Sequence, residues 1–150
     1  MDFRNLPSYQ VEIMQAAAFR TWRSMLSQIL KKHDITAMQW AVLGLVHESK
    51  TDGMSIGALA KELATSLAFV TSTVNQLVEK KLLVRENDPK DNRGRIITLA
   101  PKHTDLVDKL ETEIKEEVKR IFTGKISRIE LGMYAKVLTK LANFDAKISK

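Results

Sequence analysis

The residues best suited to chemistry are hydrogen-bonding side chains on one predicted helix. The stretch from Leu67 to about Lys80 has apolar residues at helical spacing, which predicts a helix with one buried face. The opposite face carries Thr71, Ser72, Asn75 and Gln76. A helix fits the major groove of DNA, which is about 12 Å wide, and such groups can bond base edges and phosphates there. This face predicts contact with duplex DNA, although a polar helix face is more often only solvated.

Basic residues are concentrated in the segment that follows this helix. Two short β-prone runs, 82–85 and 95–99, flank a charged stretch, which predicts a hairpin with a long tip. A hairpin there can bring Arg93 to a narrow minor groove, whose negative potential favours arginine. Lys90 and Arg95 are further candidate DNA contacts. Residues 61–103 hold eight Lys and Arg against five Asp and Glu, the densest excess of positive charge in the chain.

Catalytic and metal-binding motifs are missing from the sequence. There is no phosphate-binding glycine loop, no Gly-x-Ser-x-Gly and no His-Glu-x-x-His. The three histidines, His33, His47 and His103, have no short-spaced partner ligand. Acidic residues between 105 and 117 can be read as paired carboxylates, but a solvated helix face with negative charge in its early turns explains them better. We expect no enzyme, no cofactor and no metal.

Six helical segments and the hairpin account for the chain. Apolar spacing predicts helices over about 8–31, 37–49, 56–63, 67–80, 101–123 and 128–148. Their starts are marked by proline in the first turn and by capping residues. The starting residues are Pro7, Thr36 with Gln39, Ser55, Ser66, Pro101, and Ser127 with Glu130.

The order of these elements indicates a fold class. A short helix, a tight turn, a second helix with a polar outer face and a basic hairpin are the parts of a winged helix-turn-helix. We therefore expect a mainly α protein with a small β-hairpin, six helices plus a wing.

Length and composition favour one globular domain in the cytoplasm. The 150 residues are 44% hydrophobic and 28% charged, enough to bury a core. The absence of cysteine excludes disulfides and fits a reducing compartment. The start of the chain does not read as a secretion signal, and the longest uncharged apolar stretch, 35–46, is shorter than the roughly 20 residues of a membrane span. The net charge of +6 suits a polyanionic partner. We expect no membrane partner.

Several motifs together resemble those of the MarR family of transcription regulators. The resemblance covers the element order of the whole chain, and the DPxDxR pattern in the hairpin is its most specific part. The segments that carry it are LAKEL at 59–63, residues 66–77, LLVR at 82–85, DPKDNR at 88–93 and LAPK at 99–102, with ITAMQWAVL at 35–43 similar to the entry of the second helix.

This resemblance implies a homodimeric regulator, a repressor that binds double-stranded DNA at an inverted-repeat operator. Residues 1–34 and 101–150 would supply dimerisation helices, and residues 35–100 the DNA-binding lobe. Arg93 takes the role of the wing arginine, and Asp91 that of the acid steadying it by a charge-assisted hydrogen bond. The recognition-helix role falls on Ser66, Ala68, Phe69, Thr71, Ser72 and Asn75.

The sequence departs from the family pattern at several positions. Leu67, Ala68 and Phe69 stand where polar or basic residues are common, so base discrimination there can rest on thymine methyl contact or on DNA shape. Lys81 replaces the usual glycine that ends the recognition helix, and we expect a left-handed cap there to be strained or absent. His103 similarly replaces a frequent glycine.

The resemblance further implies a small aromatic or amphipathic effector, bound between the dimerisation helices and the DNA-binding lobe. The candidate lining residues are Phe19, Trp22, Met25, Met38 and Trp40. Such residues at helical spacing more often belong to a core, and this remains the alternative. Without cysteine, a thiol-based peroxide sensor is excluded.

The competing function is a winged-helix protein-interaction module without specific DNA binding, to which the apolar residues 67–69 point. Salt-dependent binding to duplex DNA separates the two hypotheses.

Overall fold

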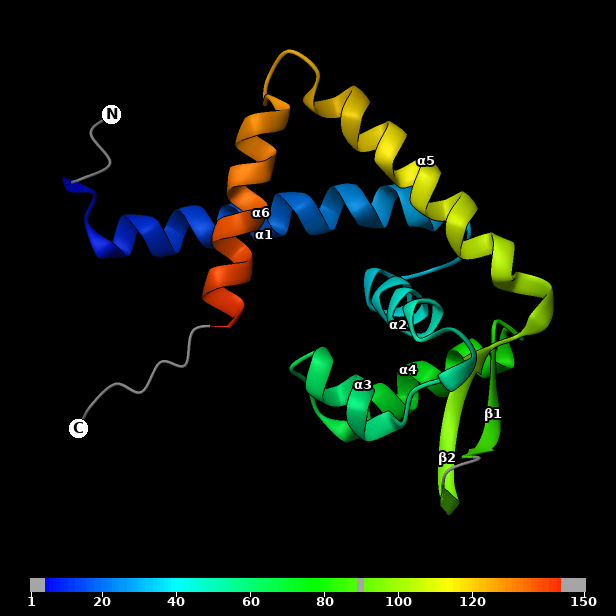
Figure 1. The fold of residues 1–150 in the computed structure, drawn as a ribbon. Helices are drawn as coiled ribbons and strands as arrows, with labels where there is room; N and C mark the ends of the chain where they lie inside the picture. Colours follow the sequence, from blue (N-terminus) through cyan, green and yellow to red (C-terminus); the bar gives the residue numbers. More distant parts are fainter. Residues whose placement is uncertain (1–4, 89–90, 144–150) are drawn as a thin grey trace, which may run out of the picture. The chain divides into compact units, whose positions relative to one another are not determined.

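Figure 1 shows the fold, a computed structural model that describes residues 5–88 and 91–143. It confirms the expected fold class of six helices and a two-stranded hairpin. The chain divides into two compact units, residues 1–112 and 113–150. The elements are α1 (Ser8–Lys31), α2 (Ala37–Glu48), α3 (Ile56–Glu62), α4 (Leu67–Glu79), β1 (Leu83–Asp88), β2 (Asp91–Leu99), α5 (Thr104–Phe122) and α6 (Arg128–Ala142).

The helices begin at the predicted capping residues. Thr36 and Gln39 form a capping box at α2, because each side chain bonds the other residue's backbone N–H. Ser55 and Ser66 accept hydrogen bonds from backbone N–H groups of α3 and α4. A side-chain cap supplies a partner that the first helical turn otherwise lacks. These local bonds therefore set where the helices start.

Four helices, α1 to α4, are followed by a residue with left-handed backbone that is not glycine: Asp34, Lys50, Ala64 and Lys81. After α4, the N–H of Lys81 bonds the carbonyl of Val78, and that of Leu82 bonds the carbonyl of Leu77. This pair of bonds is a Schellman motif. The left-handed cap at Lys81 is therefore present, with φ of 60°, and a non-glycine residue occupies it, which is the strained form of the two that were expected. Its hydrogen bonds offset the cost of a side chain in that conformation.

The hairpin strands are longer than predicted, since β1 continues to Asp88 and β2 begins at Asp91. They pair antiparallel, with Leu83 opposite Leu99. On its other side β2 is joined at Ile97 by Met54, through two backbone bonds of 3.0 and 2.8 Å. Gly53 makes this approach possible: it has φ of 63°, and a Cβ there would lie 2.9 Å from the Ile97 carbonyl oxygen.

Large aliphatic side chains from every element of the first unit form its core. The helix-turn-helix and the hairpin are thereby packed as one body, with α4 contacting α2, α3 and β1. Among the described residues, no buried side-chain nitrogen or oxygen lacks a hydrogen-bond partner. The fully buried residues of the unit include Leu30, Leu43, Leu59, Leu77, Leu83, Ile97 and Leu110.

The second unit holds the later part of α5 and all of α6. The fifth helix was predicted to begin at Pro101, but Pro101–His103 form a short 3-10 turn and α5 begins at Thr104. At α6 the predicted capping box is present: the Glu130 carboxylate accepts from the Ser127 N–H at 2.7 Å. This backbone hydrogen bond, followed by that with the Ser127 side chain, lowers the pKa of Glu130.

Candidate nucleic-acid interface

The candidate interface is centred on α4, whose inner face fixes its position. Val70, Val74 and Leu77 are each fully buried, and Thr73 beside them is 5% exposed. The Thr73 hydroxyl donates to the Phe69 carbonyl at 2.9 Å, so its burial leaves no unpaired group. The other side of α4 remains available for a partner.

That outer side brings the predicted recognition residues together. Leu67 is 59% exposed and Phe69 47%, so the apolar start of the helix is open to a partner. The Thr71 hydroxyl donates to the Leu67 carbonyl at 2.8 Å, which leaves its oxygen able to accept. The predicted residues on this exposed surface are Ser66, Ala68, Phe69, Thr71, Ser72, Asn75 and Gln76.

One hairpin face changes from apolar to basic along its length. Side chains alternate between the two faces of a strand, so Leu83, Arg85 and Asn87 share a face with their partners Leu99, Ile97 and Arg95. Leu83 and Ile97 are buried, whereas Arg85 and Arg95 are exposed. Figure 1 shows the strands running out beyond α4. On this face of the hairpin, buried apolar residues are therefore followed toward the tip by the exposed Arg85 and Arg95.

Arg85 joins this hairpin face to the recognition helix, because its guanidinium donates a hydrogen bond to Asn75 Oδ1. Sequence reasoning did not select Arg85 as a site residue. The signal was available in the alternation of the 82–87 run, which places Arg85 and Asn87 on one face. In the free protein, Asn75 therefore holds Arg85 in place through this hydrogen bond. Its amide is not an isolated group that serves only to bond a base.

The tip of the predicted wing is only partly described. Lys90 lies outside the described residues. Asp91 and Arg93 lie in β2 by backbone, and their side chains are outside the description. Their wing roles therefore stay predictions.

Gln76 has a partner that the sequence did not suggest. Its Oε1 accepts a hydrogen bond of 2.8 Å from Nε2 of Gln39, at the start of α2. Lys80, one turn further along, pairs with Asp34 at 2.9 Å and lies 3.5 Å from Gln39 Oε1. The later part of α4 is thus tied by polar groups to the turn between α1 and α2.

Comparison with solved structures gives the same fold at low sequence identity. A MarR-family transcriptional regulator from Rhodococcus sp. RHA1 has a TM-score of 0.80 at 16% identity, over 93% of this chain and 96% of the other. BpsR from Bordetella bronchiseptica, described as regulated in DNA binding by 6-hydroxynicotinic acid, has a TM-score of 0.77 at 23% identity, over 97% and 99%. A mutant of MarR from E. coli complexed with operator DNA has a TM-score of 0.77 at 20% identity, over 88% and 93%.

The sequence also matches a family model over its central part. Residues 33–94, from the end of α1 to the middle of β2, match the model of the MarR family. The match spans less than half of the chain. The matched segment contains α4, β1 with Arg85, and the first residues of β2. Most of the candidate interface therefore falls in the part that the family model covers, and Arg95 lies just beyond it.

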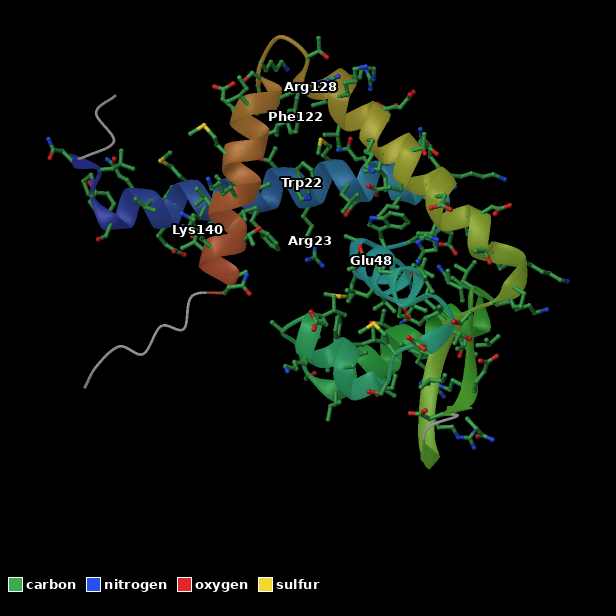
Figure 2. All side chains as sticks on the ribbon, viewed as in Figure 1. Trp22, Arg23, Glu48, Phe122, Arg128 and Lys140 are labelled. Carbon is green, nitrogen blue, oxygen red and sulfur yellow. The ribbon has the colours of Figure 1, made fainter. Side chains whose placement is uncertain are left out.

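The five residues predicted to line an effector pocket occupy two helices of the first unit. Phe19 is 59% exposed and Trp22 43%, while Met25, Met38 and Trp40 are half-buried. Arg23 stacks over the Phe19 ring at 5.6 Å, and Figure 2 shows its side chain leaving α1 on the side of α2. A hollow of about 420 Å³ elsewhere, on α5, is lined by charged residues such as Glu113, Lys119 and Arg120, which do not suit an aromatic effector. Pocket and effector stay predictions.

Neither a metal centre nor a membrane span occurs within residues 5–88 and 91–143. No group of three or more acidic or histidine side chains there is arranged to hold a metal ion. No helix in the same residues has the length and apolar character to cross a membrane.

Proposed function

We propose that this chain is a homodimeric transcription regulator, a repressor that binds double-stranded DNA at an inverted repeat and responds to a small effector. The observation that carries the proposal is the exposed face of α4 beside Arg85 and Arg95. The same fold occurs in a MarR protein solved with operator DNA. Such a function would be exercised in the cytoplasm and requires no catalysis.

The two parts of the interface would do different work. The outer face of α4 fits the major groove, where Ser72 and Gln76 can bond base edges. Arg85 and Arg95 would meet phosphates on the flank of the groove, fixing the position of the helix without reading sequence. Arg93, nearer the tip, would enter the minor groove.

Dimerisation is supported by apolar residues that have no cover within their own unit. Tyr9 and Ile13 of α1 are 63% and 60% exposed, and Ile129 and Met133 of α6 are 76% and 63% exposed. Monomeric proteins rarely leave so many large apolar side chains in water. A second copy of the chain would bury them and place two α4 helices on successive major grooves.

A selection experiment followed by titration tests DNA binding. Duplexes bound by the purified protein are selected from random sequence, and the enriched site is titrated by fluorescence anisotropy. We expect an inverted repeat with half-sites about 10 bp apart. Affinity should fall at least about 100-fold between roughly 50 and 200 mM salt, because cations are released from several phosphates.

Substitution of Arg93 tests whether the predicted wing contributes to DNA affinity. Arg93→Ala should weaken binding and reduce the salt dependence by about one phosphate contact. Lys136→Ala, an exposed change on α6, serves as the control for lost charge. Unchanged affinity with Arg93→Ala would show that the wing assignment is wrong.

The effector proposal can be tested with the protein's own fluorescence. The two tryptophans of the sequence, Trp22 and Trp40, are both among the candidate pocket residues. A panel of small aromatic carboxylic acids is titrated into the protein and into its DNA complex. We expect one class to change tryptophan emission and release DNA over the same concentration range. Release of DNA without any change in emission would place the effector elsewhere.

Exposure of Leu67 and Phe69 favours one competing function, a protein-interaction module. Failure of the wild-type protein to bind any duplex at low salt would establish that alternative and exclude the regulator.

A further inference from the structure

Gln39 is a buried amide whose surroundings determine its orientation. Only 3% of its surface is exposed, on the first turn of α2. Its Oε1 accepts from the Thr36 backbone N–H at 3.1 Å and lies 3.5 Å from the Lys80 ammonium. Both neighbours can only donate hydrogen bonds. An amide oxygen must therefore occupy this position, because the amide nitrogen would face two donors.

The orientation of Gln39 dictates that of Gln76 on the recognition helix. With its oxygen toward Thr36, Gln39 presents Nε2 to Gln76 at 2.8 Å. A nitrogen donor requires an acceptor opposite it, so Gln76 must turn Oε1 inward. The backbone N–H of Thr36 can only donate, so it determines the orientation of the buried Gln39 amide. The Gln39 amide in turn determines the orientation of the exposed Gln76 amide.

The outward-facing part of Gln76 is consequently a donor. Gln76 is exposed, and within the described chain its Nε2 has no hydrogen-bond partner. Lys80 holds the arrangement from the other side by its ion pair with Asp34. A free glutamine can bond adenine through both its oxygen and its nitrogen. Gln76 has its oxygen engaged and retains two N–H donors.

We propose that Gln39 is a positioning residue for sequence recognition, which locks Gln76 as a donor toward the DNA. This inference rests on the proposed function. Gln76 then selects a base whose exocyclic group in the major groove is an acceptor, namely O6 of guanine or O4 of thymine. It disfavours the amino groups of adenine and cytosine, which would face N–H groups instead of an oxygen.

Gln39→Glu tests the proposal with almost no change of shape. A carboxylate still accepts from Thr36 and Lys80 but cannot donate to Gln76. Gln76 then turns Nε2 inward and Oε1 outward. Sites are selected from random duplexes by the wild-type protein, by Gln76→Ala and by Gln39→Glu. Gln76→Ala should lose roughly tenfold discrimination at one position in each half-site. Gln39→Glu should change the preference at that position to adenine or cytosine.

Gln28→Glu is the matched control, since it adds the same charge at an exposed position of α1. A Gln39→Glu preference equal to that of the wild type overturns the proposal. So does an equal loss of affinity for every sequence with Gln76→Ala, which would mean a phosphate contact. If the wild-type protein selects no sequence at all, it is the proposed function that fails.

A measurement on the unmodified protein covers the case in which Gln39→Glu does not fold. Side-chain amide exchange is followed by NMR in the absence of DNA. We expect the Nε2 protons of buried Gln39 to be protected and those of Gln76 to exchange rapidly. Protected Gln76 Nε2 protons would contradict the assigned orientation.

Discussion

Individual backbone positions show how several helices of this chain end without glycine. Asp34, Ala64 and Lys81 each adopt the left-handed conformation after a helix. A side chain costs about 1–2 kcal/mol in that region relative to the right-handed one. The cost is accepted because the following hydrogen bonds satisfy carbonyls that the helix leaves open.

Lys81→Gly should therefore raise the free energy of unfolding. We expect a gain of about 0.5–1 kcal/mol, because glycine removes the strain but adds freedom to the unfolded chain. Urea unfolding followed by circular dichroism measures it. Lys81→Ala, which removes the charge and keeps the Cβ, should give no such gain. Equal free energies of unfolding for the glycine and alanine variants would show that the Lys81 backbone is not strained.

The Glu130 carboxylate gives α6 a dependence on pH. Its pKa is lowered by its hydrogen bonds to Ser127, first through the backbone N–H and then through the hydroxyl. The charged form is thus favoured in the folded helix. Its stabilising effect is present above the unfolded pKa and is lost as pH falls through the lower, folded value.

An NMR titration of the Ser127 backbone amide tests this dependence. We expect the amide shift to titrate below the ordinary pKa of glutamate. The substitution Glu130→Gln keeps the capping geometry without a titrating group. The shift in that variant should stay constant over the same range, and a persistent titration would assign the effect to another group.

At the level of elements, the contact between α4 and β1 unites the two halves of the interface. Asn75 on the helix receives a hydrogen bond from Arg85 on the strand. An arginine held in this way loses less conformational freedom when it meets a phosphate, which favours binding. In the proposed function, the helix and the hairpin would therefore approach DNA as one surface.

Arg85→Ala should weaken DNA binding and lower the salt dependence by about one phosphate contact. If Asn75 acts by holding Arg85, Asn75→Ala should cost clearly less in the Arg85→Ala background than in the wild type. Anisotropy titrations of the four proteins at several salt concentrations give this double-mutant cycle. Additive effects would show that Asn75 contacts DNA independently.

At the scale of the whole molecule, the exposed apolar residues of α1 and α6 support the proposed dimer, and a substitution on α6 can test it. Leu141→Glu places a charge at a position of α6 that is 55% exposed in the single chain. The monomer should keep its helicity, because this side chain is not buried there. Dimerisation should weaken by about 3 kcal/mol, or more than roughly 100-fold, since an unpaired carboxylate is costly to bury.

Sedimentation equilibrium measures that change, with Lys136→Glu on the same helix as the control for charge. Binding to an inverted repeat should weaken along with the dimer, while binding to a single half-site should not. A Leu141→Glu protein that remains dimeric would exclude α6 from the interface at this position.

Local signals made much of this fold predictable from sequence. Capping residues act on backbone groups three positions away, so Thr36, Ser55, Ser66 and Ser127 marked helix starts correctly. Apolar spacing likewise identified the buried face of α4. The strand ends were less predictable, because pairing across the hairpin extends them into a charged stretch of low β propensity.

The sequence by itself determined the order of elements and the polar face of α4, and it carries the resemblance to the MarR family. Only the tertiary structure decided what those polar groups do. It joined Gln76 to Gln39 and Asn75 to Arg85, and it brought Met54 against Ile97. The physical reason is the distance along the chain: caps and periodic faces depend on near neighbours. A hydrogen bond between residues 37 positions apart depends on how the helices pack.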